Sequence, residues 1–287
     1  MKLYYYAFTG HKYGLDRMRR GAVILNKLRD RGIDTMLLVN DFRAGLVARD
    51  FGVPESVNIE GIQDIDAIAQ TGDCVIIDSP EDDHGRLVKY CSDFKTVFRF
   101  AETPEDKSIH GEIMFKFNCD NDKCISSFIV DDIYYKKHQK KERTLFFLGD
   151  SDADKTILDN TEFFKDSDME LLLGSYFYVK YESDLEKIFG TIHESEEYID
   201  LICTSSSVVT VSFQTALEAS VAGAEVIFIE LEKLSSDKRE ILSKLNVILI
   251  INFNYIEYKH ALLKNVSTVT TTIEENETVI EKIINKL

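Results

Sequence analysis

The sequence predicts an α/β protein made of two doubly wound, Rossmann-like domains that face each other across a cleft. Short apolar runs alternate with helical patterns along most of the chain, and continuous apolar strands joined by helices indicate parallel sheets covered on both faces. The alternation stops at a basic run, residues 136–143, and then restarts. The length of 287 residues fits two domains. We expect the first to cover residues 1–138 and the second residues 139–287.

The first half contains four apolar runs that are typical of buried strands, separated by helical patterns. Strands are expected at residues 3–8, 35–39, 74–78 and 96–100, and helices at residues 16–30, 43–51 and 85–91. The first helix is the clearest, because Met18, Ala22 and Leu25 recur at the spacing of one helical face.

The second half repeats the pattern after the basic run, which we interpret as a solvated linker. Strands are expected at residues 144–148, 171–179, 199–203, 224–229 and 247–251, and helices at residues 154–160, 185–191, 215–222 and 274–287. The last helix has acids first and lysines late, the order that the helix dipole favours.

Composition excludes several classes of partner. The net charge of −16 and the pI of about 4.9 argue against a general nucleic-acid surface. No apolar run is long enough for a transmembrane segment and no signal peptide is evident, so we expect a cytoplasmic protein. The five scattered cysteines are typical of reduced thiols. Cys119 and Cys124 are either a turn with two chance cysteines or half a metal site, and without a second pair or a histidine cluster no metal is expected.

The segment from residue 204 to residue 229 is the most informative in the chain. It predicts a polar approach, a short helix from Thr215, a glycine stop and an apolar strand. Free N–H groups at a helix start favour phosphate, which Ser212 and Thr215 would also contact. A carboxylate such as Glu218 can accept hydrogen bonds from two adjacent sugar hydroxyls. The segment is therefore either a binding site for a nucleotide sugar or an ordinary αβ unit.

The loop after the first strand is suited to an anionic ligand. Gly14 permits a tight turn, Asp16 is placed to cap the next helix, and Arg17 and Arg20 lie at its start. His11, in the loop itself, is either a general acid or base or a surface histidine without a catalytic role.

Three further positions lie at the ends of strands or just beyond them. Asp78 ends a buried strand, and acids at that edge point into the cleft of such folds or cap the next helix; we favour a functional role for it. Glu102 follows the next strand in the same way. Gly149 ends the first strand of the second half in a turn, which either lets a ligand's phosphates approach or is an ordinary connection.

Taken in order, these motifs resemble the nucleotide-sugar hydrolases of the pseudaminic-acid pathway and the related spore-coat polysaccharide proteins, which have the glycosyltransferase-B architecture. The similarity covers most of the chain at the level of pattern. It rests on residues 14–25, 75–78, 147–152 and 212–223, of which the last are the most specific. The family's catalytic histidine is not matched, because Arg17 or Asp16 stands at its position depending on which arginine is aligned. An arginine cannot act as a base at neutral pH, whereas an aspartate can.

The resemblance implies a nucleotide-sugar enzyme of bacterial surface-glycan biosynthesis that hydrolyses or transfers the glycosyl group of a UDP-sugar. Glu218 would hold the ribose and Ser212 and Thr215 the diphosphate. Arg17 and Arg20 would offset the diphosphate charge, and His11 or Asp16 would act as the base. No cofactor is expected. The alternative is a non-catalytic nucleotide-sugar-binding or scaffolding protein that has lost the base.

Overall fold

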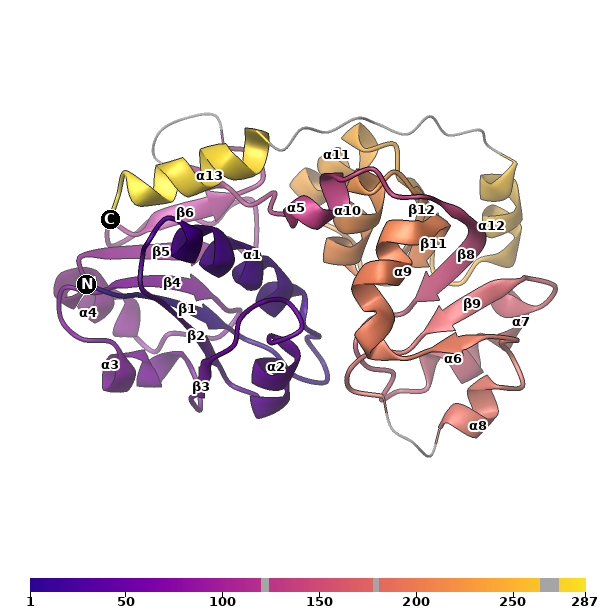
Figure 1. Ribbon diagram of the computed structural model, residues 1–287, viewed down its shortest axis with the longest axis horizontal. Coiled ribbons are helices and arrows are strands. Elements are labelled where there is room, and N and C mark those ends of the chain that lie inside the picture. Colours follow the sequence, from indigo (N-terminus) through magenta and orange to yellow (C-terminus); the bar gives the residue numbers. More distant parts are fainter. Residues whose placement is uncertain (120–123, 178–180, 264–273) are drawn as a thin grey trace. The chain divides into compact units, whose positions relative to one another are not determined.

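The computed structural model describes residues 1–119, 124–177, 181–263 and 274–287, and they form two compact units (Figure 1). Unit 1 comprises Met1–Ile129 and Ile273–Leu287, and unit 2 comprises Val130–Thr272. In the described residues each unit is built on one parallel sheet, of seven strands in unit 1 and six in unit 2. The prediction of two doubly wound α/β domains is confirmed.

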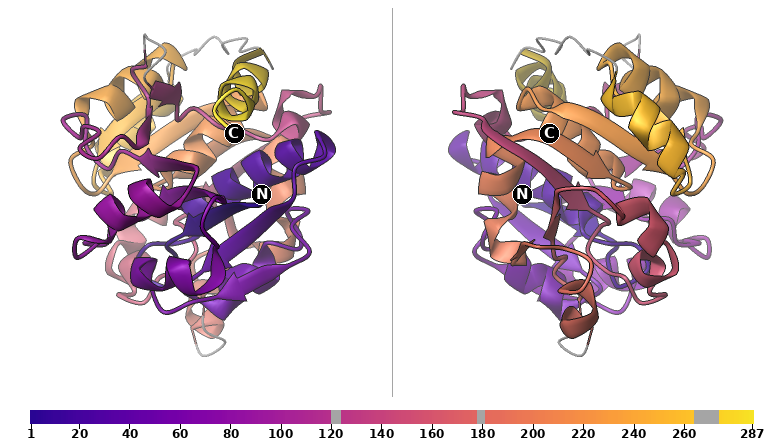
Figure 2. Two further views of the ribbon diagram at one scale, coloured as in Figure 1. Left: turned by 90° about the vertical axis from the view of Figure 1, so that its left-hand side faces the viewer. Right: turned by 90° about the vertical axis from the view of Figure 1, so that its right-hand side faces the viewer.

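The sheet of unit 1 has the order β3-β2-β1-β4-β5-β6-β7, so the strand order reverses between β1 and β4. Its strands are β1 (Leu3–Ala7), β2 (Thr35–Val39), β3 (Ser56–Asn58), β4 (Cys74–Asp78), β5 (Thr96–Phe100), β6 (Ile113–Lys116) and β7 (Cys124–Ser126). Its helices are α1 (Asp16–Asp30), α2 (Phe42–Val47), η1 (Ile62–Asp64), α3 (Ile65–Ile68), α4 (Arg86–Asp93) and α13 (Glu274–Ile284). Figure 2, left, shows this unit from its own side.

Alternation along the central strands decides which side chains lie under which helix. Tyr4 and Tyr6 of β1 belong to the apolar core on one face of the sheet, while Tyr5 lies on the other face, beneath α1. A Cβ atom on Gly21 of α1 would come within 2.5 Å of the Tyr5 ring, so the helix approaches the sheet this closely only because residue 21 is glycine.

Helix α13 packs with unit 1 although it follows unit 2 in the sequence (Figure 1). Lys27 of α1 contacts Glu277 at 2.9 Å, and Thr96 donates a hydrogen bond of 2.7 Å to the carbonyl oxygen of Lys286. One face of the helix, including Val279 and Ile283, is buried. The expected range of 139–287 had put this segment with the second half, whereas its contacts put it in unit 1.

The sheet of unit 2 has the order β10-β9-β8-β11-β12-β13, and its strand order reverses between β8 and β11. Its strands are β8 (Lys141–Phe147), β9 (Met169–Leu172), β10 (Ile192–His193), β11 (Ser205–Thr210), β12 (Glu225–Glu230) and β13 (Ile248–Ile251). Its helices are α5 (Asp132–Tyr135), α6 (Thr156–Asp159), α7 (Thr161–Phe164), α8 (Glu182–Leu185), η2 (Ser195–Glu197), α9 (Tyr198–Thr204), α10 (Phe213–Val221), α11 (Ser236–Lys244) and α12 (Tyr255–Leu262). The order is that of a dinucleotide-binding sheet.

The strand predicted at residues 199–203 is wrong. These residues form α9, whose buried side chains Tyr198, Leu201 and Ile202 recur at helical spacing. The strand is instead the serine-rich segment that follows, β11. The predicted strand 171–179 ends earlier, at Leu172, and its residues 178–179 lie outside the described part of the chain. The predicted helix 185–191 is replaced by the shorter α8.

Two cysteines are paired. Cys119 and Cys124 form a disulfide, which corrects the expectation of reduced thiols at these positions, while Cys74, Cys91 and Cys203 are free. Among the described residues, no helix has both the length and the apolar character needed to cross a membrane.

The basic run is not a wholly solvated linker, because its last residues begin β8 and Lys140 is half-buried. Lys140 donates a hydrogen bond of 2.9 Å from Nζ to the carbonyl oxygen of Cys203. Burial lowers the pKa of Lys140 to about 8, although the nearby Cys203 acts in the opposite direction. From about pH 8 up to the usual lysine pKa of about 10.4, the folded chain therefore binds fewer protons than the unfolded chain.

Replacing Lys140 by methionine is expected to make unit 2 more stable relative to the wild type below pH 8. The sign follows because the buried ammonium opposes folding there, and the wild type recovers stability as pH rises from 8 towards 10.4. Denaturant unfolding of both proteins at pH 7 and pH 10 measures the difference. Lys137→Met, at an exposed position of the same run, is the control. A difference between Lys140→Met and the wild type that does not change with pH contradicts the assignment.

Candidate functional site

The candidate site of unit 2 lies where its strand order reverses. Phe147 of β8 is paired with Thr210 of β11, and the chain leaves these two neighbouring strands into Gly149 and Ser212. Ligands of open α/β sheets bind outside the carboxyl ends of the strands at this point. The structure therefore brings the two predicted positions to one edge of the sheet.

Ser212 begins α10. Its side chain accepts a hydrogen bond of 3.1 Å from the backbone N–H of Thr215, and the Thr215 hydroxyl lies 2.8 Å from the Ser212 hydroxyl. The N–H of Ser212 in turn donates to the hydroxyl of Thr210, at the end of β11. These bonds explain why a serine caps this helix, since its oxygen satisfies an N–H group that has no partner within the helix.

Glu218 lies on α10 and is buried. One carboxylate oxygen accepts a hydrogen bond of 2.7 Å from the hydroxyl of Tyr198, and the other accepts one of 3.0 Å from the amide of Gln214. The Tyr198 hydroxyl is also 2.8 Å from that of Thr215. Ser212, Thr215, Glu218, Tyr198 and Gln214 form a connected buried network, which we call the α10 network.

Sequence reasoning missed Tyr198 and Gln214. Gln214 could have been predicted from the sequence, because it lies four residues before Glu218 and the two side chains therefore share a helical face. Tyr198 lies 20 residues from Glu218 on another helix. Its only signal was general, namely that a buried tyrosine hydroxyl needs a hydrogen-bond partner.

Gly149 has a φ of 131°, which favours glycine, and no atom lies within 4 Å of where its Cβ would be. The close approach at this turn occurs at Gly174, in the loop after β9. A Cβ atom there would lie 2.3 Å from the carbonyl oxygen of Gly149 and from Cα of Asp150. The loop after β9 therefore packs against the turn after β8 at Gly174, while the space beside Cα of Gly149 is open.

In unit 1 the loop after β1 is a closed turn. Gly10 and Gly14 form a bridge, the N–H of Gly14 donates to the carbonyl oxygen of Gly10 at 2.8 Å, and both glycines have positive φ. Asn40 at the end of β2 accepts a hydrogen bond from the N–H of Thr9 and donates one back. His11 lies in the turn, half-buried. The loop therefore holds His11 on a fixed backbone at the carboxyl ends of β1 and β2.

Asp78 is wholly buried beneath α1. Its carboxylate accepts three hydrogen bonds. Two come from Arg20, from Nε at 2.6 Å and from Nη2, and the third comes from the hydroxyl of Tyr5 at 2.5 Å. Arg17 Nε is 3.5 Å away. Asp78 alternates with Val75 and Ile77, which belong to the core on the opposite face, and this alternation directs it towards α1.

The arginines expected to offset a ligand's charge have acidic partners of their own. Arg17 donates from Nη2 to both carboxylate oxygens of Glu102, at 3.0 and 2.9 Å, and Arg20 forms a bidentate pair with Asp78 through Nε and Nη2. Arg20 also lies over the ring of Phe100, 4.5 Å from its centroid. Two guanidinium groups therefore face two carboxylates, and this cluster has no net charge.

The electrostatics of the cluster follow from burial. Burial and the charge of Asp78 raise the pKa of Tyr5 well above its usual value, so its hydroxyl stays protonated as a donor. Burial acts to lower the pKa of Arg20, but the charge and hydrogen bonds of Asp78 outweigh it and raise that pKa. Arg20 therefore stays charged beneath α1.

Asp16 is not the helix cap that the sequence predicted. Leu15 occupies the cap position, and Asp16 is the first helical residue, where a carboxylate interacts favourably with the helix dipole. Its side chain contacts Arg19 at 3.1 Å, one turn further on. Among the residues that the structure describes, no group of three or more histidine, cysteine, aspartate or glutamate side chains is arranged to hold a metal ion.

No family model matches this sequence, and no curated protein matches it. Solved structures do match. The chain is similar to the UDP-GlcNAc 2-epimerase of Methanocaldococcus jannaschii in complex with UDP-GlcNAc and UDP, with a TM-score of 0.62 and 12% identity over 99% of this chain and 100% of that one. It is also similar to S. aureus MnaA bound to UDP, with a TM-score of 0.64 and 13% identity over 100% of this chain and 98% of the other.

A third similar structure is a glycotransferase of kitacinnamycin, with a TM-score of 0.57 and 9% identity over 99% of this chain and 95% of that one. At these identities the likeness concerns the fold. The chain has two parallel-sheet α/β domains of the glycosyltransferase-B type, as the resemblance implied. Membership of the pseudaminic-acid hydrolase family stays a prediction.

Proposed function

We propose that this protein binds a nucleotide sugar, in the first instance a UDP-sugar, at the carboxyl edge of the unit 2 sheet and hydrolyses or transfers its glycosyl group. The observation that carries the proposal is the α10 network. It is a buried set of hydroxyls, one amide and one carboxylate, on α10 and the neighbouring Tyr198 of α9, at the edge of the sheet where the strand order reverses. Protein–ligand contacts of open α/β sheets concentrate there.

The diphosphate would contact the start of α10, where backbone N–H groups and the helix dipole favour negative charge. Ser212 and Thr215 supply hydroxyls at the same end of the helix. The arginine pairs of unit 1 are already neutralised by Asp78 and Glu102, so the helix start becomes the principal source of positive potential. The start of α10 could bind the diphosphate in this way without a metal or cofactor.

Glu218 would accept hydrogen bonds from the two ribose hydroxyls. A bound ribose would replace the amide of Gln214, which lies in the first turn of α10, while the Tyr198 hydroxyl keeps the carboxylate oriented. Fold neighbours that contain UDP or UDP-GlcNAc support the choice of nucleotide. They include both epimerases and a glycotransferase, so transfer or hydrolysis rests on the resemblance in the sequence.

A non-catalytic nucleotide-sugar-binding protein is the second candidate. It is favoured by one observation, that Asp78 is wholly buried and paired with Arg20 and Tyr5, and therefore cannot accept a proton from an acceptor. Binding of a nucleotide sugar without its breakdown would distinguish this candidate from an enzyme.

Glu218→Ala is expected to weaken UDP binding at least tenfold. Hydrogen bonds to a charged group contribute about 1.5–3 kcal/mol, and about 1.4 kcal/mol is a tenfold change in affinity. The variant also removes the buried carboxylate that accepts hydrogen bonds from Tyr198 and Gln214, so unit 2 should lose about 1–3 kcal/mol of stability. Calorimetric titration with UDP below the unfolding range measures the affinity, after a thermal-shift screen of UDP-, CMP- and GDP-sugars.

Two further variants sharpen this measurement. Glu218→Gln keeps one acceptor oxygen and should lose less affinity than the alanine variant. Glu225→Ala, at an exposed position at the start of β12, should bind UDP as the wild type does. An unchanged dissociation constant in Glu218→Ala would show that this carboxylate only stabilises its helix.

A further inference from the structure

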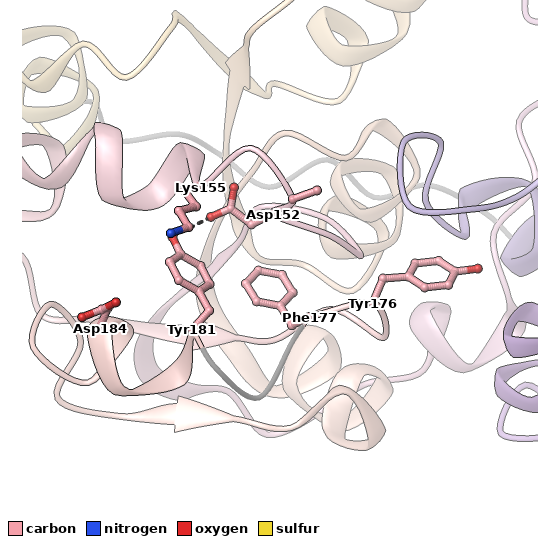
Figure 3. A pocket seen from close by; sticks show the side chains of 7 residues that line it. Asp152, Lys155, Tyr176, Phe177, Tyr181 and Asp184 are labelled. Carbon is pink, nitrogen blue, oxygen red and sulfur yellow. Dashed lines mark hydrogen bonds between the residues drawn. The ribbon is translucent and has the colours of Figure 1, made fainter.

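A second candidate site lies on the other side of β8 from the α10 network. A cavity of about 230 Å³ opens where the loops after β8 and β9 meet (Figure 3). Its walls include Asp152, Lys155, Tyr176, Phe177, Tyr181 and Asp184. Cavities for drug-sized ligands measure about 300–1,000 Å³, so this one has room for a single ring.

Aromatic rings form one wall of the cavity. The rings of Phe177 and Tyr181 lie nearly parallel, at 22°, with centroids 6.3 Å apart. Both side chains are labelled in Figure 3. Phe177 is only partly buried against the core of unit 2, so part of its ring surface is open to a ligand. A flat apolar ring face of this kind packs against the C–H groups of a sugar ring or against a base.

The polar groups of the wall are held in place. Asp152 accepts hydrogen bonds from the Tyr181 hydroxyl at 2.9 Å and from the backbone N–H groups of Thr156 and Ile157 at 2.6 and 3.1 Å. A carboxylate offers about four acceptor positions, so one remains. Burial and this bond to Asp152 raise the pKa of Tyr181, which keeps its hydroxyl a donor. Asp184 accepts one bond from Lys187 at 2.7 Å and has acceptor capacity left.

The charge of the wall selects the kind of ligand. Among the described residues that line the cavity, Asp152 and Asp184 are the acids and Lys155 is the cation, and Lys187, which is 2.7 Å from Asp184, offsets the remaining negative charge. The cavity therefore has no excess positive charge with which to hold a phosphate or a carboxylate. Lys155 has a φ of 57°, a conformation that L-residues seldom adopt and that often marks a functional position. Carboxylate acceptors and an ammonium donor beside an aromatic face suit the hydroxyl groups of an uncharged ring.

We infer that this cavity binds one neutral sugar ring, with its C–H face on Phe177 and its hydroxyls on Asp184, Asp152 and Lys155. The site is separate from the α10 network and does not depend on nucleotide binding. A nucleobase would leave the two carboxylates with fewer donors to pair, because its ring presents fewer hydroxyl-like donors than a sugar does.

The test uses ligand-observed NMR with glucose, galactose and N-acetylglucosamine, and glucose 6-phosphate as an anionic counterpart. At least one neutral sugar should bind saturably and more tightly than glucose 6-phosphate. Phe177→Leu keeps the apolar volume but removes the ring face, and should weaken binding about two- to twelvefold. Asp184→Asn, at a half-exposed position, should weaken it about tenfold.

Phe253→Leu is the matched control, because Phe253 is likewise packed partly buried against the unit 2 core but does not line the cavity. It should bind the sugar as the wild type does, and Phe177→Leu should bind UDP as the wild type does. The inference is overturned if no neutral sugar saturates the protein, if glucose 6-phosphate binds more tightly, or if both cavity variants keep full affinity. An equal loss of UDP and sugar affinity in Phe177→Leu would also overturn it, because the cavity would then belong to the nucleotide site.

Discussion

Asp78→Ala is expected to destabilise unit 1 by about 3–5 kcal/mol, since removing one partner of a buried ion pair leaves an uncompensated buried charge. Arg20 would lose both of its hydrogen bonds to the carboxylate, and the buried Tyr5 hydroxyl would lose its acceptor. For a unit of this size the unfolding midpoint should fall by roughly 10 °C. Thermal and denaturant unfolding, followed separately for each unit, measure the change.

Two variants test the origin of this loss. Glu277→Ala removes an acid that also contacts two cations, Lys27 and Arg31, but at the surface, so it should cost less than about 1 kcal/mol. The double variant Asp78→Ala with Arg20→Met removes both charges and should recover much of the stability. A loss below about 1 kcal/mol for Asp78→Ala alone would mean that the pair does not stabilise the fold, and would return Asp78 to the catalytic candidates.

The second large effect concerns the proposed reaction. If the protein breaks down a nucleotide sugar, His11→Asn should lower turnover by roughly 10²–10⁴-fold, the usual contribution of a positioned general base. Binding of UDP should change little, because the proposed nucleotide contacts lie in unit 2. His11 is preferred over Asp16, whose carboxylate already contacts Arg19. Release of UDP from UDP-GlcNAc and other UDP-sugars, with and without acceptors, measures the rate.

His84→Asn supplies the control for this experiment. His84 is an exposed histidine in the loop after β4, and its replacement should leave turnover unchanged. If Asp16→Asn abolishes activity while His11→Asn is nearly silent, Asp16 is the base. If the wild type binds nucleotide sugars but breaks none down, the non-catalytic candidate is correct and the protein has no base to find.

The secondary structure of the first half could be predicted closely from the sequence. The bounds expected for α1, β2, β4 and β5 agree with those of the structure. Central strands of a parallel sheet are buried on both faces and α1 is buried on one, so each leaves a strong local apolar pattern. Edge strands, and strands rich in polar residues, leave a weaker apolar pattern in the sequence. The serines of β11 are a clear case, because Ser206 exchanges hydrogen bonds with the backbone of Arg143 and Ser205 accepts one from its side chain.

The candidate site was predictable only as a set of positions. Ser212, Thr215 and Glu218 were found because they lie close together on one short segment, whose spacing shows that they share a helix. The partners of Asp78 were not predictable in the same way. Arg20 is 58 residues away and Glu102 lies 85 residues from Arg17, and nothing local links them.

The sequence by itself determined the two α/β halves, the glycine turns and the helix expected from Thr215, which the structure begins two residues earlier, at Phe213, because apolar periodicity and glycine act through neighbours in the chain. Only the tertiary structure decided that Asp78 lies beneath α1 with Arg20, that Tyr198 holds Glu218, and that α13 packs on unit 1. The physical reason is that charges and hydroxyls pair with whatever the fold brings within about 3 Å of them, and that proximity is a property of sheet order and helix packing rather than of spacing along the chain.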